Sequence, residues 1–558
     1  MTIQLKHRIA ALVETAAAEA QRQGALPSGP LPDIEVERPQ NPDHGDFSVS
    51  LPLKLARAAR MNPMAIAQRL TPLLPSEEAI AGVQIAPPGF INFRVSQAWL
   101  QQQVESVISE GGRFGNLTLA RPQRVQVEFV SVNPTGPVHV GHARGAVLGS
   151  GLASILAAAG HNVSREYYIN DAGTQMQVFY RSLYARYLQA LGREAAMPEN
   201  GYMGEYMLDL GREVASEHGD RFARMPEAEA VAAIGKIGLE KMLALIRADL
   251  EAIGVTFDVW FSETTLYATG QYAETIEMLR QNGYVTQREG ATWFTSTQLG
   301  EDKDNVLVRS TGDPTYFASD IAYHRNKFLA RGFDRVINIW GADHQGHVSR
   351  LKAAAGALGV DPSRLTIVIS QLVTLKQGDD VVRASKRKGN IVTLRELVEE
   401  VGADACRFFF LSRSPESQME FDLELAKQQS SDNPVYYVQY AYARIASILR
   451  LAQEKGLDWS GGDVALLTDP AELDLVKKML QLPELIETMA ARLEPHHLPR
   501  YAMDLATAFH WFYQQCRVVS SEPSEKPITL ARLKLVDASR VALARCLSLM
   551  GMSAPERM

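Results

Sequence analysis

The stretch Val125-Gln-Val-Glu-Phe-Val130, with Asn133-Pro-Thr-Gly-Pro137 and His139-Val-Gly-His142 after it, decides the predicted fold. Its first residues alternate between apolar and polar as a strand does, and the run with two prolines and a glycine ends that strand. A helix is predicted over 140–159 and a second strand over 163–169. A strand, a loop, a helix and another strand in this order are typical of a parallel sheet with helical crossovers.

Outward from this unit, other segments of the chain show different patterns. Strand-like runs at 335–340 and 365–375 extend the predicted sheet, whereas 199–301 is charged and helical in pattern, as an insertion is. From Asn433 onward, apolar residues recur at three and four spacing, which predicts a helix bundle. The predicted fold is α/β: a Rossmann-like parallel-sheet nucleotide-binding core with a helical insertion, an α+β N-terminal module and an all-α C-terminal bundle.

Length supports a division into several domains. At roughly 150 residues per domain, 558 residues correspond to about 3.7 domains, so three or four are expected. The expected parts are an N-terminal module (1–115), the two halves of the nucleotide-binding core (116–198 and 302–430), the insertion between them (199–301) and the bundle (431–558).

Composition excludes several classes of protein. With 57 Lys and Arg against 64 Asp and Glu, the net charge of −7 argues against a polycationic protein, although a local basic surface can still bind nucleic acid. The values of 46% hydrophobic and 22% charged residues exclude wholesale disorder. The three cysteines (Cys406, Cys516 and Cys546) lie far apart, so neither a structural zinc site nor a disulfide is expected, and a reducing compartment is.

One segment has the length of a membrane span. The 20 residues between Arg144 and Arg165 carry no charge, but their glycines, serines, histidine and asparagine make them too polar for a lipid-facing helix. The N-terminus lacks the basic start and apolar block of a secretory signal. We therefore expect a soluble, cytoplasmic chain with no membrane partner.

The strand-to-helix turn is a candidate nucleotide site. No G-x-x-x-x-G-K-[ST] loop is present, and Gly149-x-Gly151 lies inside the predicted helix, where it indicates close helix packing. His139 and His142 stand instead at the helix N-terminus, whose free N–H groups favour an anion such as phosphate. Two alternatives remain from the residues alone: helix-capping histidines, or a metal pair without a third ligand.

A second candidate is the run Arg383-Ala384-Ser385-Lys386-Arg387-Lys388-Gly389-Asn390. A cation-dense loop beside a parallel sheet suits a clamp over triphosphate or pyrophosphate. The alternative is a solvated surface loop, which is the usual outcome for an isolated charge run.

Together the two segments resemble the two signatures of class I aminoacyl-tRNA synthetases, and the finer match is to the arginyl-tRNA synthetases of bacterial type. The resemblance covers nearly the whole chain, from residues 41–47, which resemble an N-terminal tRNA-contacting module, to the ending 554–558. The blocks that carry it are Glu128-Phe-Val-Ser-Val-Asn133-Pro-Thr-Gly-Pro-Val-His139-Val-Gly-His142, Tyr167-Tyr-Ile-Asn-Asp171-Ala-Gly-Thr-Gln175, Tyr316-Phe-Ala-Ser-Asp320, Trp340-Gly-Ala-Asp343-His344 and Asn433-Pro-Val-Tyr-Tyr437-Val-Gln-Tyr440-Ala-Tyr-Ala-Arg444.

The second signature departs from the usual pattern. Arg383 replaces the first lysine, Ala384 the methionine and Arg387 the last serine, while Lys386 keeps the second-lysine position, which this family often lacks. Arg383 keeps the positive charge with a different geometry. We therefore expect the loop as a whole, rather than any one cation in it, to be functional.

The resemblance implies activation of L-arginine by ATP, with Mg²⁺, and transfer of arginine to tRNA(Arg) by a monomer. It assigns catalysis to His139, His142 and Lys386. ATP binding would involve Gly136, Pro137, His139, Gly141, His142, Arg383, Ser385 and Lys386. The arginine pocket would contain Glu128, Asn133, Tyr316, Asp320 and His344. The tRNA contacts would include Lys54, Arg57, Tyr437, Tyr440 and Met558.

Each assignment has a plainer alternative. Glu128 suits a strand-end salt bridge, Tyr316 a core ring and His344 a structural histidine, while the lysine and arginine of the N-terminal module suit a solvated face. Tyr437 and Tyr440 could both belong to the bundle core or could stack on unpaired bases. For the whole chain, two other functions compete: a small-molecule nucleotidylyltransferase, and a tRNA-binding protein without catalysis.

Overall fold

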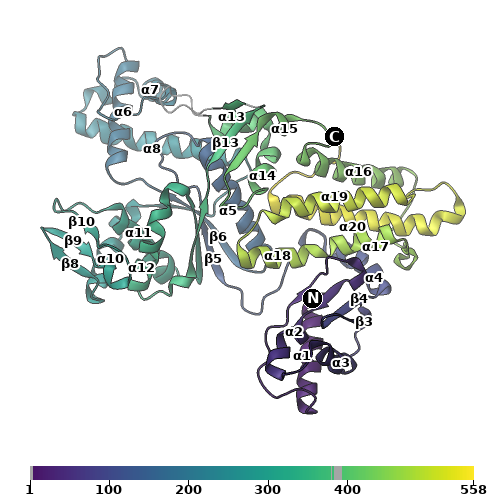
Figure 1. Cartoon of the computed structure of the whole chain (residues 1–558). Helices are drawn as coiled ribbons and strands as arrows, with labels where there is room; N and C mark the ends of the chain where they lie inside the picture. Colours follow the sequence, from purple (N-terminus) through teal and green to yellow (C-terminus); the bar gives the residue numbers. More distant parts are fainter. Residues whose placement is uncertain (1–3, 379, 383–391) are drawn as a thin grey trace.

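The computed structural model describes residues 4–378, 380–382 and 392–558. Arg383, Ser385 and Lys386 of the second signature therefore lie outside the described residues. Figure 1 shows the central sheet between a helical region on one side and a long helix bundle on the other.

The core is a five-stranded sheet in which every neighbouring pair of strands is parallel. The strand order is β12-β11-β5-β6-β7, and this confirms the predicted parallel-sheet core. The strands are β5 (Arg124–Glu128), β6 (Asn162–Ile169), β7 (Val259–Ser262), β11 (Arg335–Gly341) and β12 (Leu365–Ser370).

The order of the strands shows where a ligand can bind. From β5 the chain builds β6 and β7 on one side of the sheet, and later β11 and β12 on the other. At such a switch point the crossover helices diverge and leave a crevice at the carboxyl ends of the strands. The helices that follow the strands of the core are α5 (Val140–Ala158), α6 (Thr174–Ala190), α9 (Thr264–Ala268) and α12 (Val348–Ala357).

Helix α5 packs tightly against the core. A Cβ on Gly149 would lie 2.2 Å from the ring of Phe129, and one on Gly151 would lie 3.0 Å from Leu411. Because real Cβ atoms do not approach other atoms so closely, at Gly149 above all, both glycines serve helix packing, as predicted. No helix among the described residues is long and apolar enough to cross a membrane.

The range 199–301 holds the predicted helices, α7 (Glu205–His218), α8 (Glu227–Ala252), α9 and α10 (Gln271–Gln281), together with strands that the sequence pattern did not predict. Strand β7 is an edge strand of the core sheet. Strands β8 (Val285–Arg288) and β9 (Ala291–Phe294) join β10 (Asn305–Val308) in a separate antiparallel sheet. Each is four residues long, too short for a clear period.

The predicted run 365–375 also proves to be two strands, β12 and β13 (Val373–Gln377). Gln371 separates them and donates its backbone N–H to Pro415 instead of to a strand. The second strand belongs to a small sheet in the order β14-β13-β15. The elements of this part are α11 (Tyr316–Arg325), β14 (Asp380–Val382), α13 (Leu394–Val401), α14 (Ala403–Leu411), β15 (Met419–Asp422) and α15 (Leu423–Lys427).

The two ends of the chain form the predicted α+β module and helix bundle. In the module, a four-stranded sheet of order β1-β2-β4-β3 packs with three helices. From Asn433 to Met558, where every residue is described, there is no strand. Asn433 caps α16 by accepting the backbone N–H of Val435, and Pro434 occupies the first helical position, so sequence alone explains where this helix begins.

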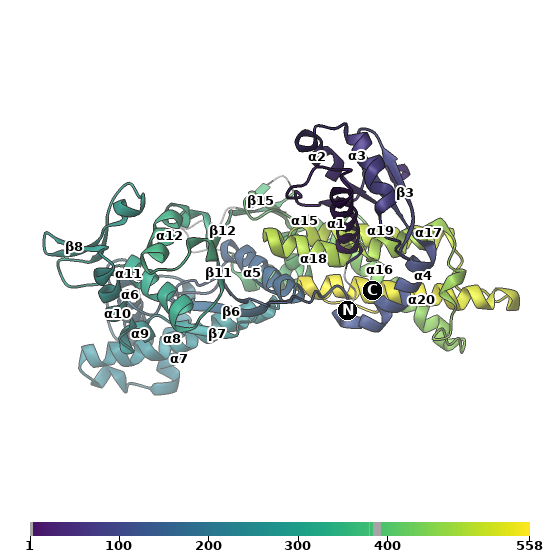
Figure 2. The ribbon, with the colours of Figure 1, turned by 90° about the horizontal axis from the view of Figure 1, so that it is seen from below.

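Figure 2 shows the module lying across the bundle near α18. The module contains α1 (Leu5–Arg22), β1 (Val36–Glu37), β2 (Phe47–Val49), α2 (Leu51–Ala59), α3 (Pro63–Leu70), β3 (Ile80–Ala86) and β4 (Phe90–Val95). The bundle contains α16 (Pro434–Glu454), α17 (Pro470–Met479), α18 (Gln481–Arg492), α19 (His497–Gln515) and α20 (Lys526–Met550), and α4 (Gln97–Glu110) packs on it.

Candidate active site

The predicted site residues gather at the carboxyl edge of the core sheet. Glu128 is the last residue of β5, and His139 is the N-cap of α5, the helix that follows it. His344 follows β11 in the short helix Ala342–His347. This edge is where open parallel sheets bind ligands.

The His139-Val-Gly-His142 segment, called the HVGH segment below, presents two close histidine rings. Their centroids are 4.1 Å apart. Burial, together with the neighbouring His139, lowers the pKa of His142 to about 4, so this ring is neutral at pH 7. A neutral imidazole offers one N–H donor and one acceptor, and it carries no charge of its own toward a phosphate.

The plainer explanations of the histidines find little support. His139 occupies the N-cap position, but its side chain makes no cap hydrogen bond, and His142 lies within the first turn. No group of three or more metal-binding side chains occurs in the described part of the chain. Gly141, between the two histidines, is exposed. A Cβ at this position would lie 3.1 Å from the ring of His139, so the glycine leaves room for this ring.

The loop between β5 and α5 is shaped by unusual backbone. Val130 and Ser131 have φ values of 70° and 44°, a region that β-branched residues rarely adopt. Farther along, Asn133 is exposed and donates its amide to Gln175 over 2.6 Å. Gly136 lies against Tyr206 of α7, whose hydroxyl donates to the carbonyl of Thr135. Strained backbone of this kind is common at ligand sites.

His344 lies near the HVGH segment. The charges of Asp343 and His344 both influence the pKa of His142, so these side chains lie near it. The His344 side chain is half exposed and contacts the rings of Trp340 and His347. It is therefore no satisfied core histidine.

Glu128 already has partners within the protein. Its buried carboxylate forms an ion pair with Lys327, which is fully buried and also donates to Asn338 over 3.0 Å. Ser131 donates to its other oxygen over 3.1 Å. The structure thus shows the strand-end salt bridge, which sequence reasoning kept as the alternative for this residue.

Asp320 differs from Glu128 because its charge is not balanced. Burial raises the pKa of this carboxyl to about 7, helped by the charges of Glu128 and Glu263, and Arg350 and Lys327 offset only part of the effect. Among the described residues, no hydrogen bond or ion pair to the Asp320 carboxylate is found. A carboxylate in this state favours an incoming cation.

Glu263 lies near Asp320, and sequence reasoning did not select it. It follows β7, is buried, and its Oε2 atom has no hydrogen-bond partner among the described residues. Burial raises the pKa of this carboxyl as well. The sequence signal, a glutamate directly after a strand, was hidden because the four residues of β7 are half-buried throughout and show no alternation.

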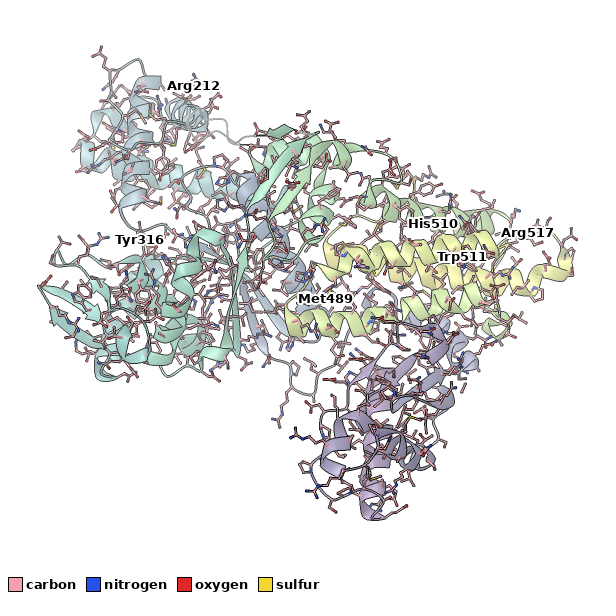
Figure 3. All side chains as sticks on the ribbon, viewed as in Figure 1. Arg212, Tyr316, Met489, His510, Trp511 and Arg517 are labelled. Atoms are coloured by element: carbon pink, nitrogen blue, oxygen red, sulfur yellow. The ribbon has the colours of Figure 1, made fainter. Side chains whose placement is uncertain are left out.

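Tyr316 is no core ring. It is 57% exposed at the start of α11, and Figure 3 marks it at the edge of that region on the side toward the helical region with α6, α7 and α8. Its ring lies near Gly173, where a Cβ would be 3.7 Å from the tyrosine hydroxyl. The ring is therefore accessible at the surface beside Gly173, and it lies four residues before Asp320 in the chain.

The chain that follows the second signature returns to the HVGH segment. The carbonyl of Val392 accepts the N–H of Val140 over 3.1 Å, and the N–H of Leu394 donates to Val138 over 2.8 Å. His139 and Thr393 form the β-bridge between them. The HVGH segment is thus joined by backbone hydrogen bonds to the residues that follow the second signature in the chain.

The predicted tRNA contacts differ in their surroundings. Lys54 forms an ion pair with Glu35 at 2.8 Å and donates to the carbonyl of Asp33, so its charge is already engaged. Arg57 is exposed one helical turn away, and Met558 is exposed at the C-terminus.

The two tyrosines lie on the outer side of the bundle. Tyr437 is half-buried, with its hydroxyl 3.3 Å from Thr507. Tyr440 is exposed, accepts a hydrogen bond from Arg444 over 2.6 Å and is covered in part by that guanidinium. Trp511 and Tyr513 of α19 are exposed nearby, and Figure 3 marks Trp511 beside His510. Tyr440 is therefore no core residue.

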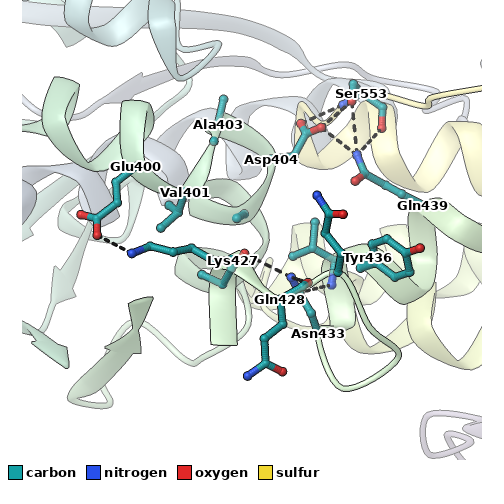
Figure 4. Close-up of a pocket in the computed structure, with 15 residues that line it drawn as sticks. Glu400, Val401, Ala403, Asp404, Lys427, Gln428, Asn433, Tyr436, Gln439 and Ser553 are labelled. Carbon is teal, nitrogen blue, oxygen red and sulfur yellow. Dashed lines mark hydrogen bonds and ion pairs between the residues drawn. The ribbon is translucent and has the colours of Figure 1, made fainter. Parts of the chain in front are cut away.

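A polar pocket lies where α13, α14 and α15 meet α16, and none of the predicted site residues lines it (Figure 4). Lys427 pairs with Glu400 at its wall, at 2.6 Å. Ser553 and Gln439 both donate to Asp404, which ties the C-terminal segment to α14.

Three family models match the chain in succession. They are the arginyl tRNA synthetase N-terminal domain (residues 4–95), the tRNA synthetases class I (R) catalytic domain (103–409) and the DALR anticodon binding domain (438–558). The catalytic model alone covers more than half of the chain.

Curated and solved relatives agree with these models. Arginine–tRNA ligases from Dehalococcoides mccartyi and Moorella thermoacetica are 56% and 50% identical, each over 99% of both chains. A putative arginyl-tRNA synthetase from Campylobacter jejuni is 32% identical over 83% of this chain and 100% of its own, with a TM-score of 0.76. The Thermus thermophilus enzyme shares the fold, with a TM-score of 0.77 at 24% identity over 99% of this chain and 100% of its own.

Proposed function

The chain belongs to the arginyl-tRNA synthetases, and on that premise we propose which of its residues carry each step. It is an arginine–tRNA ligase with a class I catalytic domain. It activates L-arginine with ATP to arginyl-adenylate and pyrophosphate, then transfers arginine to the 3'-terminal adenosine of tRNA(Arg). We also propose that the five parts expected from the sequence are the domains of this enzyme.

Activation is attack by the arginine carboxylate on the α-phosphorus of ATP, with pyrophosphate leaving. A carboxylate is ionised at pH 7, so the reaction needs no general base, and catalysis rests on positioning and on stabilising phosphate charge. In our proposal His139 and the neutral His142 donate N–H groups to the phosphate oxygens. Gly136, Pro137 and Gly141 let the nucleotide approach the backbone.

Arg383, Ser385 and Lys386, outside the described residues, complete the proposed ATP site by neutralising pyrophosphate. Mg²⁺ keeps several waters and binds substrate phosphates, so we expect it to enter with ATP. The described donor set contains no dedicated metal cluster, and every step proposed here is carried by the chain's own residues.

The substrate guanidinium is bound, in our proposal, by Asp320 and Glu263. The observation that carries this assignment is that the two carboxylates are close enough for the charge of Glu263 to raise the pKa of Asp320, and neither forms an ion pair with a cation among the described residues. A guanidinium presents five donors in a plane, which suits two carboxylates. A lysine ammonium would leave acceptors unpaired, at about 1–3 kcal/mol for each.

The other pocket residues have supporting roles. Glu128 acts through Lys327, with which it is paired. In our proposal the exposed Tyr316, Asn133 and His344 line the rest of the arginine site. We further propose that Lys54, Arg57 and Met558 contact tRNA, that Tyr437 and Tyr440 stack on unpaired bases, and that the enzyme is a cytoplasmic monomer.

A charging assay tests the assignment. Purified protein with total tRNA and ATP is offered each of the twenty amino acids, and only arginine should be esterified. Formation of an adenylylated small molecule without RNA would favour a nucleotidylyltransferase instead, and tRNA binding without charging would favour a catalytically silent binder.

A further inference from the structure

Helix α8 carries an aspartate in its apolar stripe. Met242, Ile246, Leu250 and Ile253 are buried at three- and four-residue spacing, and Asp249 lies among them with only 1% of its surface exposed. Aspartate is almost never fully buried unless a partner balances its charge. The partners of Asp249 therefore identify the segments that its carboxylate connects.

Asp249 has two partners from different segments. Arg395 of α13 donates to its Oδ1 atom through Nε, at 2.9 Å, and through Nη2, at 2.8 Å. The backbone N–H of Val138 also bonds the carboxylate and favours its ionised form, against the effect of burial. Charge-assisted bonds of this kind are about twice as strong as neutral ones.

These partners lie at the two segments that backbone hydrogen bonds join, the HVGH segment and the residues around Thr393. Val138 directly precedes His139, and Arg395 follows the bridge residue Thr393 by two positions. Because Leu394 donates to Val138 over 2.8 Å, the three segments close into one hydrogen-bonded ring. Asp249 comes from neither of the two segments that this ring joins, because it belongs to α8.

We propose that Asp249 is a positioning residue: it holds the HVGH segment against the N-terminus of α13 and so sets where His139 and His142 meet ATP. The inference rests on the proposed roles of these histidines. Asp249 itself touches no substrate. Its carboxylate orients the backbone N–H that enters the HVGH segment, and Arg395 keeps that carboxylate ionised and fixed in place.

The test compares Asp249→Asn, Arg395→Met and the double variant with the unaltered full chain. Because a displacement of about 1 Å can cost on the order of a hundredfold in rate, we expect Asp249→Asn to lower kcat of arginine charging at least about tenfold. The KM for arginine should stay within about twofold, because its pocket lies elsewhere. The double variant should lose little more than either single change, since the two residues act as a unit.

The matched control is Glu472→Gln. Glu472 is also a buried carboxylate, 1% exposed, and it forms an ion pair with an arginine, Arg532, at 2.7 Å. It belongs to α17 of the bundle, far from the HVGH segment in the chain. Its replacement should lower the melting temperature as Asp249→Asn does, but leave kcat at saturating tRNA unchanged.

Amide hydrogen exchange provides a readout that is independent of catalysis. Peptides that contain Val138 to Ala143 and Val392 to Glu396 should exchange faster in Asp249→Asn and at the normal rate in Glu472→Gln. Unchanged exchange in Asp249→Asn would overturn the inference, whatever happens to kcat. Faster exchange with unchanged kcat would instead show that the HVGH histidines do not have the roles proposed for them.

Discussion

The carboxylate pair (Asp320 and Glu263) and the aromatic face of the bundle (Tyr440, Arg444 and Tyr513) differ in whether their side chains already have partners. In the pair, Glu263 is buried and Asp320 half-buried, and neither carboxylate has a cationic partner in the described structure. On the aromatic face, exposed rings already contact Arg444. The carboxylate pair therefore lacks a positive counter-charge, which a ligand can supply. The aromatic face, in contrast, has its partners within the protein and needs no ligand.

This difference separates two kinds of recognition. Charges interact strongly where water is excluded, so a ligand that lacks the matching charge is rejected sharply. Stacking on exposed rings is worth about 1–3 kcal/mol per base and tolerates several bases. Selection of the amino acid should therefore depend on few residues, and binding of tRNA on many.

The largest effect is expected from Asp320→Asn. Breaking a buried charge pair costs about 2–5 kcal/mol, so the KM for arginine should rise by a factor of roughly 30 or more, while the KM for ATP changes little. Charging kinetics with each substrate varied in turn measure both constants. The exposed Asp302→Asn serves as the control, and equal rises of the two KM values would refute the assignment.

Low pH should weaken the binding of arginine even in the unaltered enzyme. The pKa of Asp320 is about 7, so its carboxylate is mostly ionised at pH 8 and takes up a proton as the pH falls through 7. Because the neutral acid no longer pairs with guanidinium, the KM for arginine should rise by up to about tenfold for each pH unit below 7. A flat profile between pH 8 and pH 6 would contradict the role of this carboxyl.

On the aromatic face, Tyr440→Ala should raise the KM for tRNA by a factor of roughly 5 to 100, from the loss of one stacked base. The KM values for arginine and ATP should not change. Leu451→Ala is the matched control, because Leu451 is exposed on the same helix, α16, and belongs to no ring contact. If both variants bound tRNA equally well, the face would have no such role.

The smallest effects are expected in the N-terminal module. Replacing a residue that contacts phosphate lowers the salt slope of RNA binding by about one, and Arg57→Ala should do so. Lys54→Ala should change the slope less, because Lys54 is already paired with Glu35 at 2.8 Å. Filter binding of tRNA at several salt concentrations measures the salt slope of each variant. A larger change of the slope in Lys54→Ala than in Arg57→Ala would contradict this prediction.

Local patterns were sufficient to predict the centre of the fold. The alternation in β5, the break after it and the uncharged helix placed His139 and His142 at the carboxyl edge of a parallel sheet, as the structure shows. Asp320 and Tyr316 were selected by resemblance to the family, since neither stands out in an isolated sequence.

The interactions that escaped prediction join residues that are distant in the chain. Glu128 and Lys327 are 199 positions apart, and Asp249 and Arg395 are 146 apart, so no local period connects them. Glu263 follows a strand too short to recognise. Their common signal, a charge at a buried position, becomes visible only when the fold shows what is buried.

Competition by L-citrulline tests the central claim, that unpartnered buried carboxylates recognise the charge of the substrate. Citrulline has nearly the shape of arginine but an uncharged ureido group, and it is added to arginine-charging reactions of the unaltered enzyme and of Asp320→Asn. We predict that citrulline inhibits the unaltered enzyme at least about a hundredfold more weakly than arginine binds, and that this gap narrows in the variant. Equal affinity of the unaltered enzyme for citrulline and arginine would contradict the account.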